Sequence, residues 1–252
     1  MSNIIDSGSV IKLGQYPYYE NGEKEPMQWA VLHVSPEKGV LVVNLRCIDS
    51  KQFNEEFVPM NWEGSSLRRW LNNEFFNSSF SDSEKRQITY ACIDNNNLHP
   101  DQYEYTFANE SVGYTNDYIF LLSISEYNFY LKSENFKMRA TQYAIKNGAY
   151  CKNGTNCGWW LRTPAFDNPY EINYGDENWW GRNSYIKKDH ITFVYCGEYS
   201  REDGNYTDCT GYGVCPAMWL SREGLEKYAT GQRVSIGLTE EDRQRIYNMF
   251  EN

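Results

Sequence analysis

The sequence predicts a single α+β domain, and three observations lead to this fold class. Strand-forming residues are concentrated at Trp29 to Val34 and Val40 to Val43, and the turn-forming residues 35–39 between them predict a hairpin. Short stretches with helical periodicity follow, each preceded by a capping residue. Neither a Pro/Gly/Ser-rich linker nor an internal repeat divides the 252 residues, which favours one domain over two.

Other strands are expected from short apolar or β-branched runs. Val10 to Leu13 forms the first of them, and residues 15–27 after it contain two prolines and a glycine, so we expect a loop there. The remaining predicted strands are 118–123, 159–162, 191–195 and 214–220. Residues 94–113 are polar and lack periodicity, which predicts a long loop.

The first predicted helix places Leu67, Trp70 and Leu71 on one face. Ser81 and Glu84 have the spacing of a capping box, which predicts a second helix. The other predicted helices begin at capping residues: 125–131 at Ser125, 141–148 at Thr141 with Gly148 at its C-terminal end, and 239–250 at Thr239.

The charge of the chain argues against several classes of partner. It carries 24 Lys and Arg against 34 Asp and Glu, a net charge of −10. Phosphate binding needs a cationic surface, so nucleic acids and anionic membrane surfaces are disfavoured. No apolar run is long enough to cross a bilayer, and residues 1–10 lack the features of a secretory signal. We therefore expect a cytoplasmic protein, with assembly into a virion or non-classical export left open.

The seven cysteines do not form a recognisable metal or disulfide framework. Their number is odd, and the pairs Cys151/Cys157 and Cys209/Cys215 share a C-x5-C spacing that is unusual for zinc. The three histidines do not cluster with them in the sequence. We expect mostly buried thiols and no metal, with disulfide or redox chemistry as the alternative.

An ordered set of short motifs identifies a family resemblance. The motifs are the segments Trp62 to Asn72, Phe120 to Glu126, Ala140 to Ala144, Trp159 to Pro164 and Val214 to Leu220, together with Trp29, Phe75 and Phe80. Over residues 10–221 the chain resembles the DUF6273 domain of bacteria and phages. The resemblance implies a C-type-lectin-like fold, similar to that of formylglycine-generating enzymes, with short helices around a small antiparallel sheet. It places the domain at 1–221, followed by a C-terminal extension at 222–252.

The resemblance also implies a binding function. Several family members are targets of diversity-generating retroelements, which randomise a segment between the Trp-Trp-Leu-Arg motif and the closing Pro-Ala motif. That interval is 166–212 in this chain, and its richness in Asn, Tyr, Asp and Gly suits such mutagenesis. The family usually has Arg before the proline of the closing motif, where this chain has Cys215, so the loop is either held in another way or looser.

Residues 166–212 have the composition of a recognition surface, in which rigid aromatic side chains alternate with hydrogen-bonding neighbours. Trp159, Trp160 and Trp219 belong to apolar strands and are expected in the core. At least one of Trp179 and Trp180, flanked by Asn and Gly, is expected to be exposed. We predict a protein or glycan ligand and no chemical step, and the sequence does not indicate an oligomeric state. The predicted contact residues are Tyr170, Asn173, Tyr174, Asp176, Asn178, Trp179, Trp180, Arg182, Asn183, Tyr185, Tyr199 and Tyr206.

Three alternatives are open, and one of them, a structural module of a phage or of a larger assembly, would have the same sequence features. Cys209 and Cys215 flank a Gly-Tyr-Gly turn and are candidates for a copper-binding thiol pair, which makes a thiol- or metal-dependent enzyme the leading alternative. Calcium is the second, because carboxylates gather in the same part of the chain. The candidate calcium ligands are Glu171, Asp176, Glu177, Asp203 and Asp208.

Overall fold

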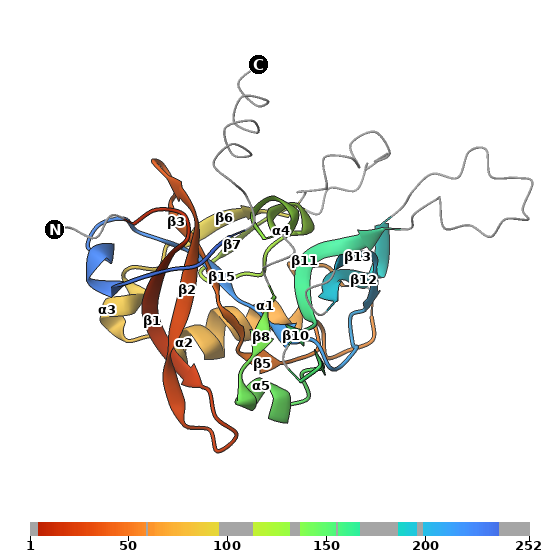
Figure 1. Cartoon of the computed structure of the whole chain (residues 1–252). Coiled ribbons are helices and arrows are strands. Elements are labelled where there is room, and N and C mark those ends of the chain that lie inside the picture. Colours follow the sequence, from red (N-terminus) through yellow and green to blue (C-terminus); the bar gives the residue numbers. More distant parts are fainter. Residues whose placement is uncertain are drawn as a thin grey trace, which may run out of the picture.

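The protein has a mixed α+β fold built mostly from β-sheets, with a few short helices (Figure 1). The computed structural model describes residues 5–58, 60–95, 113–131, 137–154, 156–166, 186–195 and 199–236. The predicted helix 239–250 and residues 167–185 lie outside these ranges.

The first sheet is antiparallel and contains the predicted hairpin, formed by β2 (Lys24–Ser35) and β3 (Gly39–Asn44). The prediction of a loop over residues 15–27 was wrong. The pairing of β1 with β2 continues through Gln15↔Pro26 to Pro17↔Lys24, so only the tip between these strands is a turn. In spatial order the strands are β15 (Ala217–Leu220), β3 (Gly39–Asn44), β2 (Lys24–Ser35), β1 (Ser9–Pro17) and β16 (Ala229–Arg233).

The second sheet contains two of the predicted strands and much of the C-terminal half of the chain. In spatial order its strands are β13 (Tyr199–Tyr206), β12 (Ile186–Tyr195), β11 (Trp159–Phe166), β14 (Gly213–Val214) and β5 (Asp49–Ser50). Only β11 and β14 run parallel. The β12–β13 hairpin lies inside 166–212, so this interval is not entirely loop.

The predicted strand 214–220 is two strands in different sheets. Pro216 lacks an N–H and cannot continue a ladder of hydrogen bonds, and the chain changes sheets around it. Val214 accepts a hydrogen bond from the N–H of Ile48 at 2.9 Å, and Pro216 accepts one from Asn44 at 2.9 Å. The closing motif therefore connects the two large sheets.

Two smaller sheets complete the β-structure of the described residues. One contains β4 (Arg46–Cys47), β8 (Arg139–Ala140), β10 (Asn156–Cys157) and β9 (Cys151–Lys152), in that spatial order. The other pairs β6 (Ala91–Asp94) with β7 (Tyr114–Asp117).

The helices begin where capping residues predict, with one exception. Ser81 and Thr141 are N-caps as predicted, and Ser65, for which no cap was predicted, is the N-cap of the first helix. The prediction of Ser125 as a cap was wrong: Ser123 accepts from the N–H of Glu126 at 3.1 Å, and the Glu126 carboxylate accepts from the N–H of Ser123 at 2.7 Å. The helices are α1 (Ser66–Trp70), the π-helical turn η1 (Leu71–Phe75), α2 (Phe76–Ser79), α3 (Asp82–Lys85), α4 (Ile124–Tyr130), α5 (Gln142–Lys146) and the 3₁₀ helix η4 (Leu225–Tyr228).

Residues 118–123 are buried as predicted but do not form a strand. Only Phe120 makes a bridge, with Ala217. The Asn72 side chain satisfies other backbone groups of this segment. Its amide oxygen accepts a hydrogen bond from the N–H of Tyr118 at 2.8 Å, and its amide nitrogen donates one to the carbonyl of Ile119 at 2.8 Å. The segment can therefore be buried without belonging to a sheet.

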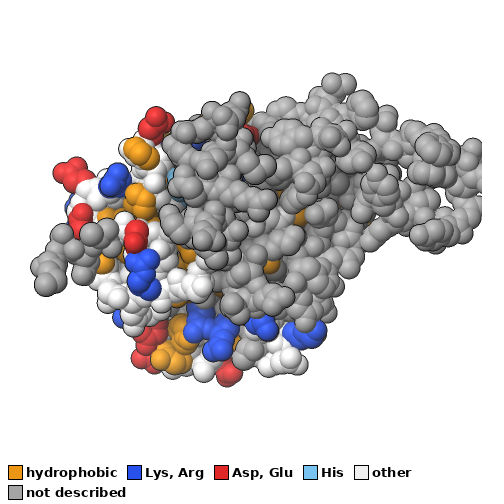
Figure 2. All heavy atoms as spheres, turned by 45° about the horizontal axis from the view of Figure 1, so that its top comes forward, with side chains coloured by type: hydrophobic (Ala, Val, Ile, Leu, Met, Phe, Trp, Pro, Cys, Tyr) orange, Lys and Arg blue, Asp and Glu red, His pale blue; other side chains and the backbone are white. Residues whose placement is uncertain are grey.

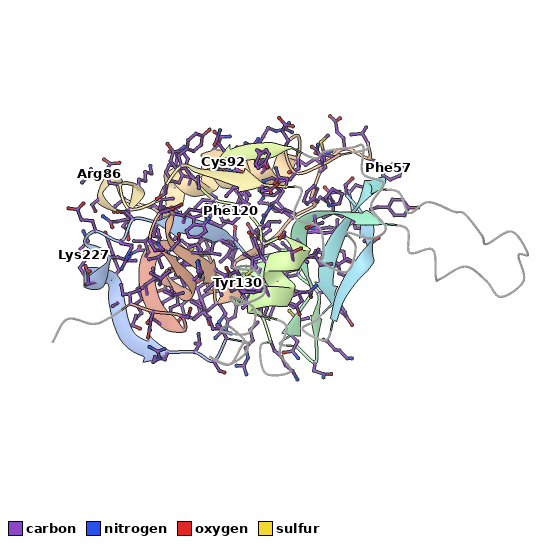
Figure 3. The ribbon with its side chains drawn as sticks, turned by 90° about the horizontal axis from the view of Figure 1, so that it is seen from above. Phe57, Arg86, Cys92, Phe120, Tyr130 and Lys227 are labelled. Carbon is purple, nitrogen blue, oxygen red and sulfur yellow. The ribbon has the colours of Figure 1, made fainter. Side chains whose placement is uncertain are left out.

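The core extends between the sheets, and Phe120 lies in its interior (Figure 3). Trp159 and Trp160 are buried as predicted, and Trp29 and Trp62 are buried too. Trp219 was also expected in the core but is only partly buried. Basic and acidic side chains lie near one another on the described part of the face in Figure 2. Among the described residues no helix is long and apolar enough to cross a membrane.

Candidate functional site

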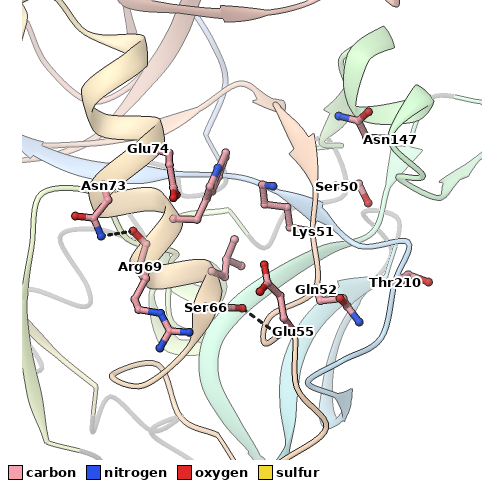
Figure 4. Close-up of a pocket in the computed structure, with 12 residues that line it drawn as sticks. Ser50, Lys51, Gln52, Glu55, Ser66, Arg69, Asn73, Glu74, Asn147 and Thr210 are labelled. Carbon is pink, nitrogen blue, oxygen red and sulfur yellow. Dashed lines mark hydrogen bonds between the residues drawn. The ribbon is translucent and has the colours of Figure 1, made fainter.

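A pocket of about 620 Å³ opens between α1–η1 and the chain that follows β5 (Figure 4). One wall consists of helical side chains, the opposite wall of residues 50–55, and Asn147 and Thr210 lie at one end. Glu74 and Asn73 belong to the π-helical turn, an irregularity often found at functional sites. The lining residues are Ser50, Lys51, Gln52, Glu55, Ser66, Leu67, Arg69, Trp70, Asn73, Glu74, Asn147 and Thr210.

The pocket combines an aromatic ring with both signs of charge. The Lys51 ammonium lies 4.6 Å from the centre of the Trp70 ring, a cation–π contact. The two cations Lys51 and Arg69 are matched by the carboxylates Glu55 and Glu74. The lining therefore has no formal net charge and offers donors and acceptors beside an indole, which suits a polar, uncharged ligand such as a sugar or a peptide backbone.

A buried carboxylate behind the pocket fixes two of its lining residues. Asp49 accepts from the Asn147 amide at 2.7 Å and from the N–H of Ser50 at 2.8 Å. It also accepts from the Tyr16 hydroxyl at 2.8 Å. Burial and the neighbouring Asp49 carboxylate raise the pKa of Tyr16 above its usual value, so its hydroxyl remains protonated and donates.

The 205–212 segment, the end of the predicted binding interval, is tied to this wall of the pocket. Gln52 donates to the carbonyl of Asp208 at 2.6 Å, and the N–H of Asn54 donates to Thr207 at 2.9 Å. The Tyr212 ring packs against Trp160 with centroids 4.2 Å apart, and its hydroxyl accepts from Asn205 at 2.8 Å. These contacts hold the segment in place from both ends.

Two exposed aromatic rings lie on the same two segments, residues 50–58 and 205–212. Phe57 is 61% exposed and Tyr206 43% exposed, and their ring centroids are 5.4 Å apart in an edge-on arrangement. Figure 3 shows Phe57 at the outer edge of the molecule beside the second sheet. We call this pair, together with the pocket, the candidate binding surface. Sequence analysis identified Tyr206 but missed Phe57, because only tertiary pairing brings residues 50–58 beside 205–212.

The structure describes few of the other predicted contact residues. Tyr199 begins β13, and only its backbone is described. Tyr206 is exposed, as a contact residue must be. The remaining predicted contacts lie outside the described residues: Tyr170, Asn173, Tyr174, Asp176, Asn178, Trp179, Trp180, Arg182, Asn183 and Tyr185.

Cys209 and Cys215 have different surroundings. The Cys209 thiol bonds to the Asn205 side chain at 3.2 Å, whereas the Cys215 thiol is buried against the carbonyl of Asn44 and the sulfur of Met138. Burial raises the pKa of both thiols, which lowers their reactivity as nucleophiles. In the described ranges no group of three or more His, Cys, Asp or Glu side chains is arranged to hold a metal ion.

Two ion pairs that involve residues of the motifs have a structural role. Arg68 donates to Asp117 at 2.6 Å, and Asp117 also accepts from the Trp62 indole at 2.9 Å. Arg162, almost fully buried, donates to Glu126 and to the carbonyl of Leu121.

These contacts join segments that are far apart in the sequence. Residues 37–222 match the model of DUF6273, a domain of unknown function. The chain belongs to the DUF6273 family. The matched region contains the whole candidate binding surface but begins after β1 and β2, the strands that pair with β16 and β3. No curated protein and no solved structure matches the chain significantly.

Proposed function

We propose that this DUF6273 protein is a non-enzymatic binding protein that recognises a protein or glycan through the candidate binding surface and the adjoining interval 166–212. The observation that supports this is the 205–212 segment: its backbone is fixed to the scaffold while Tyr206 faces solvent beside Phe57 and Thr210 lines the pocket. A fixed frame that displays exposed aromatic rings loses little entropy on binding.

The proposal includes a C-type-lectin-like fold and diversification of 166–212 by a retroelement. Support comes from the position of the interval, which lies between the buried Trp159–Trp160 strand and the buried closing motif. Substitutions in this interval that spare the buried Ile191 and Phe193 of β12, the strand paired with β11, leave the buried side chains of both flanking strands in place. A reverse transcriptase gene and a near-copy of the segment encoding 166–212 beside the gene are the expected genomic context. Population sequencing with substitutions spread evenly along the gene would contradict diversification.

Binding is tested by screening the full-length protein on a glycan array and against surface proteins of neighbouring bacteria. For any ligand found, we expect Phe57→Ala with Tyr206→Ala to raise Kd at least tenfold, because exposed aromatic anchors dominate binding energy. Tyr114→Ala is the matched control, since this residue is 64% exposed on β7, in a different sheet. Equal effects of the two changes would argue against the assigned surface.

The non-enzymatic part of the proposal has its own test. Purified, unreduced protein is analysed for metal, and its thiols are titrated. We expect neither copper nor zinc at stoichiometric levels. A bound copper ion that protects Cys209 and Cys215 from alkylation would instead support the thiol-dependent enzyme.

A further inference from the structure

Four of the cysteines converge on one place in the fold. They come from three strands of the small β4–β8–β10–β9 sheet and from the closing motif: Cys47, Cys151, Cys157 and Cys215. A methyl group added to Gly213 would lie 2.7 Å from the sulfurs of both Cys47 and Cys157, which shows how tightly these thiols surround the chain there. The Cys215 thiol contacts the sulfur of Met138 at 3.8 Å in the same region.

Within this group, Cys151 and Cys157 are directly opposite each other on β9 and β10. The N–H of Cys157 donates to the carbonyl of Met138, just before β8, and not to Cys151. The N–H of the next residue, Gly158, donates to the carbonyl of Tyr150, just before β9, at 3.2 Å. Cys151 and Cys157 are therefore a non-hydrogen-bonded pair. In such a pair the Cα atoms are about 4.5 Å apart with both side chains on one face, which lies within the range of disulfides.

The two thiols already interact and differ in exposure. Hydrogen bonding to Cys157 and burial raise the pKa of Cys151. Cys157 is fully buried, whereas Cys151 is partly exposed. An oxidant in solution can therefore reach Cys151 first. Cys157 is then positioned to displace the group that the oxidant leaves on Cys151.

We propose that Cys151 and Cys157 form a cross-strand disulfide when the folded protein meets a small disulfide such as oxidised glutathione. The Cys151 thiol loses its proton and its sulfur attacks the oxidant, which releases one glutathione thiol and leaves a mixed disulfide. The Cys157 sulfur, after losing its proton, attacks the Cys151 sulfur and releases the second glutathione. The protein loses two hydrogens and one glutathione disulfide becomes two thiols.

The bond would close the hairpin that supports the candidate binding surface. The N–H of Tyr150 donates to the carbonyl of Gly211 at 2.7 Å, and the N–H of Gly213 donates to Gly158 at 2.7 Å. The 150–158 hairpin thus holds both sides of the turn that ends the 205–212 segment. Closing it restricts the unfolded chain over the short loop, and we expect Tm to rise by roughly 3–8 °C.

The test uses the full-length protein incubated with oxidised glutathione in mildly alkaline buffer, alkylated, and digested with trypsin without reduction. Lys152 lies between the two cysteines, so the disulfide links two separate peptides, 147–152 and 153–162. We expect this linked pair, with a mass two hydrogens below the sum of the peptides, and its loss after reduction. Cys151→Ser is the control variant, because the residue is not fully buried, and it should remove both the linked pair and the Tm rise.

Cys92 provides an internal standard, since it is exposed on β6. We expect it to carry glutathione as a mixed disulfide under the same conditions. Because the raised pKa of Cys151 slows its reaction, incubation continues well beyond the point at which Cys92 has reacted fully. The proposal is overturned if Cys151 and Cys157 are still alkylated at the end of that incubation. It is also overturned if Cys157 is found linked to Cys47 or Cys215 instead.

Discussion

Replacing Glu126 by Gln removes the negative charge that faces the Arg162 guanidinium while keeping the shape of the side chain. Glu126 lies in the first turn of α4 and Arg162 lies in β11, so the pair joins two motifs of the family. The Arg162 side chain is 1% exposed and that of Glu126 is 20% exposed. A second contact of the pair, from Nη2 of Arg162 to Oε1 of Glu126, is 3.1 Å long.

The expected loss in the free energy of unfolding follows from how far each side chain of the pair is exposed. Removing one partner of a fully buried ion pair costs about 3–5 kcal/mol, because a charge remains buried without a counter-charge. Water reaches Glu126 in part, and Arg162 keeps the carbonyls of Leu121 and Asp94 as acceptors. We therefore expect Glu126→Gln to lower the free energy of unfolding by about 2–4 kcal/mol.

A double-mutant cycle separates the charge interaction from other effects. Arg162→Met keeps a long, flexible side chain but removes the charge, and the double variant has neither partner. We expect the double variant to be about 1–3 kcal/mol less destabilised than the sum of the single changes, measured by urea unfolding with tryptophan fluorescence. Additivity to within about 0.5 kcal/mol would refute the coupling. Asp6→Asn is the control, because the Asp6–Arg233 pair is more than half exposed and should contribute under about 1 kcal/mol.

The remaining predictions concern the core, the pH response and the predicted contacts. Trp160→Ala should lower the free energy of unfolding by about 3–5 kcal/mol, and a near-neutral result in the urea assay would contradict its burial. Burial opposes ionisation of Glu84, but hydrogen bonds from Ser81 and a backbone N–H outweigh it and lower its pKa below the usual 4.5. The stability that Glu84 contributes is therefore complete above about pH 4.5 and is lost as pH falls through the lower pKa of the folded state. Glu84→Gln should reduce the fall of Tm with decreasing pH, measured as a series of Tm values over this acidic range. An unchanged dependence of Tm on pH would exclude the effect. Replacing Trp179 and Trp180 together by Ala should weaken ligand binding with little change in Tm, whereas a large fall in Tm would mean that they are core residues.

The sequence predicted the elements whose signals are local. Helix caps at Ser81 and Thr141 were found because a side chain and an N–H three residues later decide them. The β2–β3 hairpin was found because its strands and its turn adjoin in the chain. Where two local signals competed, the prediction failed: Ser123 and Ser125 are both capping types, and the Glu126 carboxylate favours Ser123.

The binding surface was only partly visible in the sequence. Tyr206 was predicted from the composition of its interval, and it is exposed. Phe57 and the pocket beside Trp70 come from a different part of the chain, where no composition signal marks them. The pairing of residues 50–58 with 205–212 depends on hydrogen bonds such as that from Gln52 to Asp208, which spacing along the chain does not predict.

By itself the sequence determined the fold class, the family and the buried tryptophan strand, because periodicity, capping and ordered motifs are carried by neighbouring residues. The tertiary structure alone decided which distant groups meet. It placed Arg162 against Glu126, brought Cys151 and Cys157 to opposite positions in a sheet, and put Phe57 beside Tyr206. Such contacts form when sheets and helices pack together to bury apolar surface, and the residues that meet are selected by the geometry of the whole domain rather than by their neighbours in the chain.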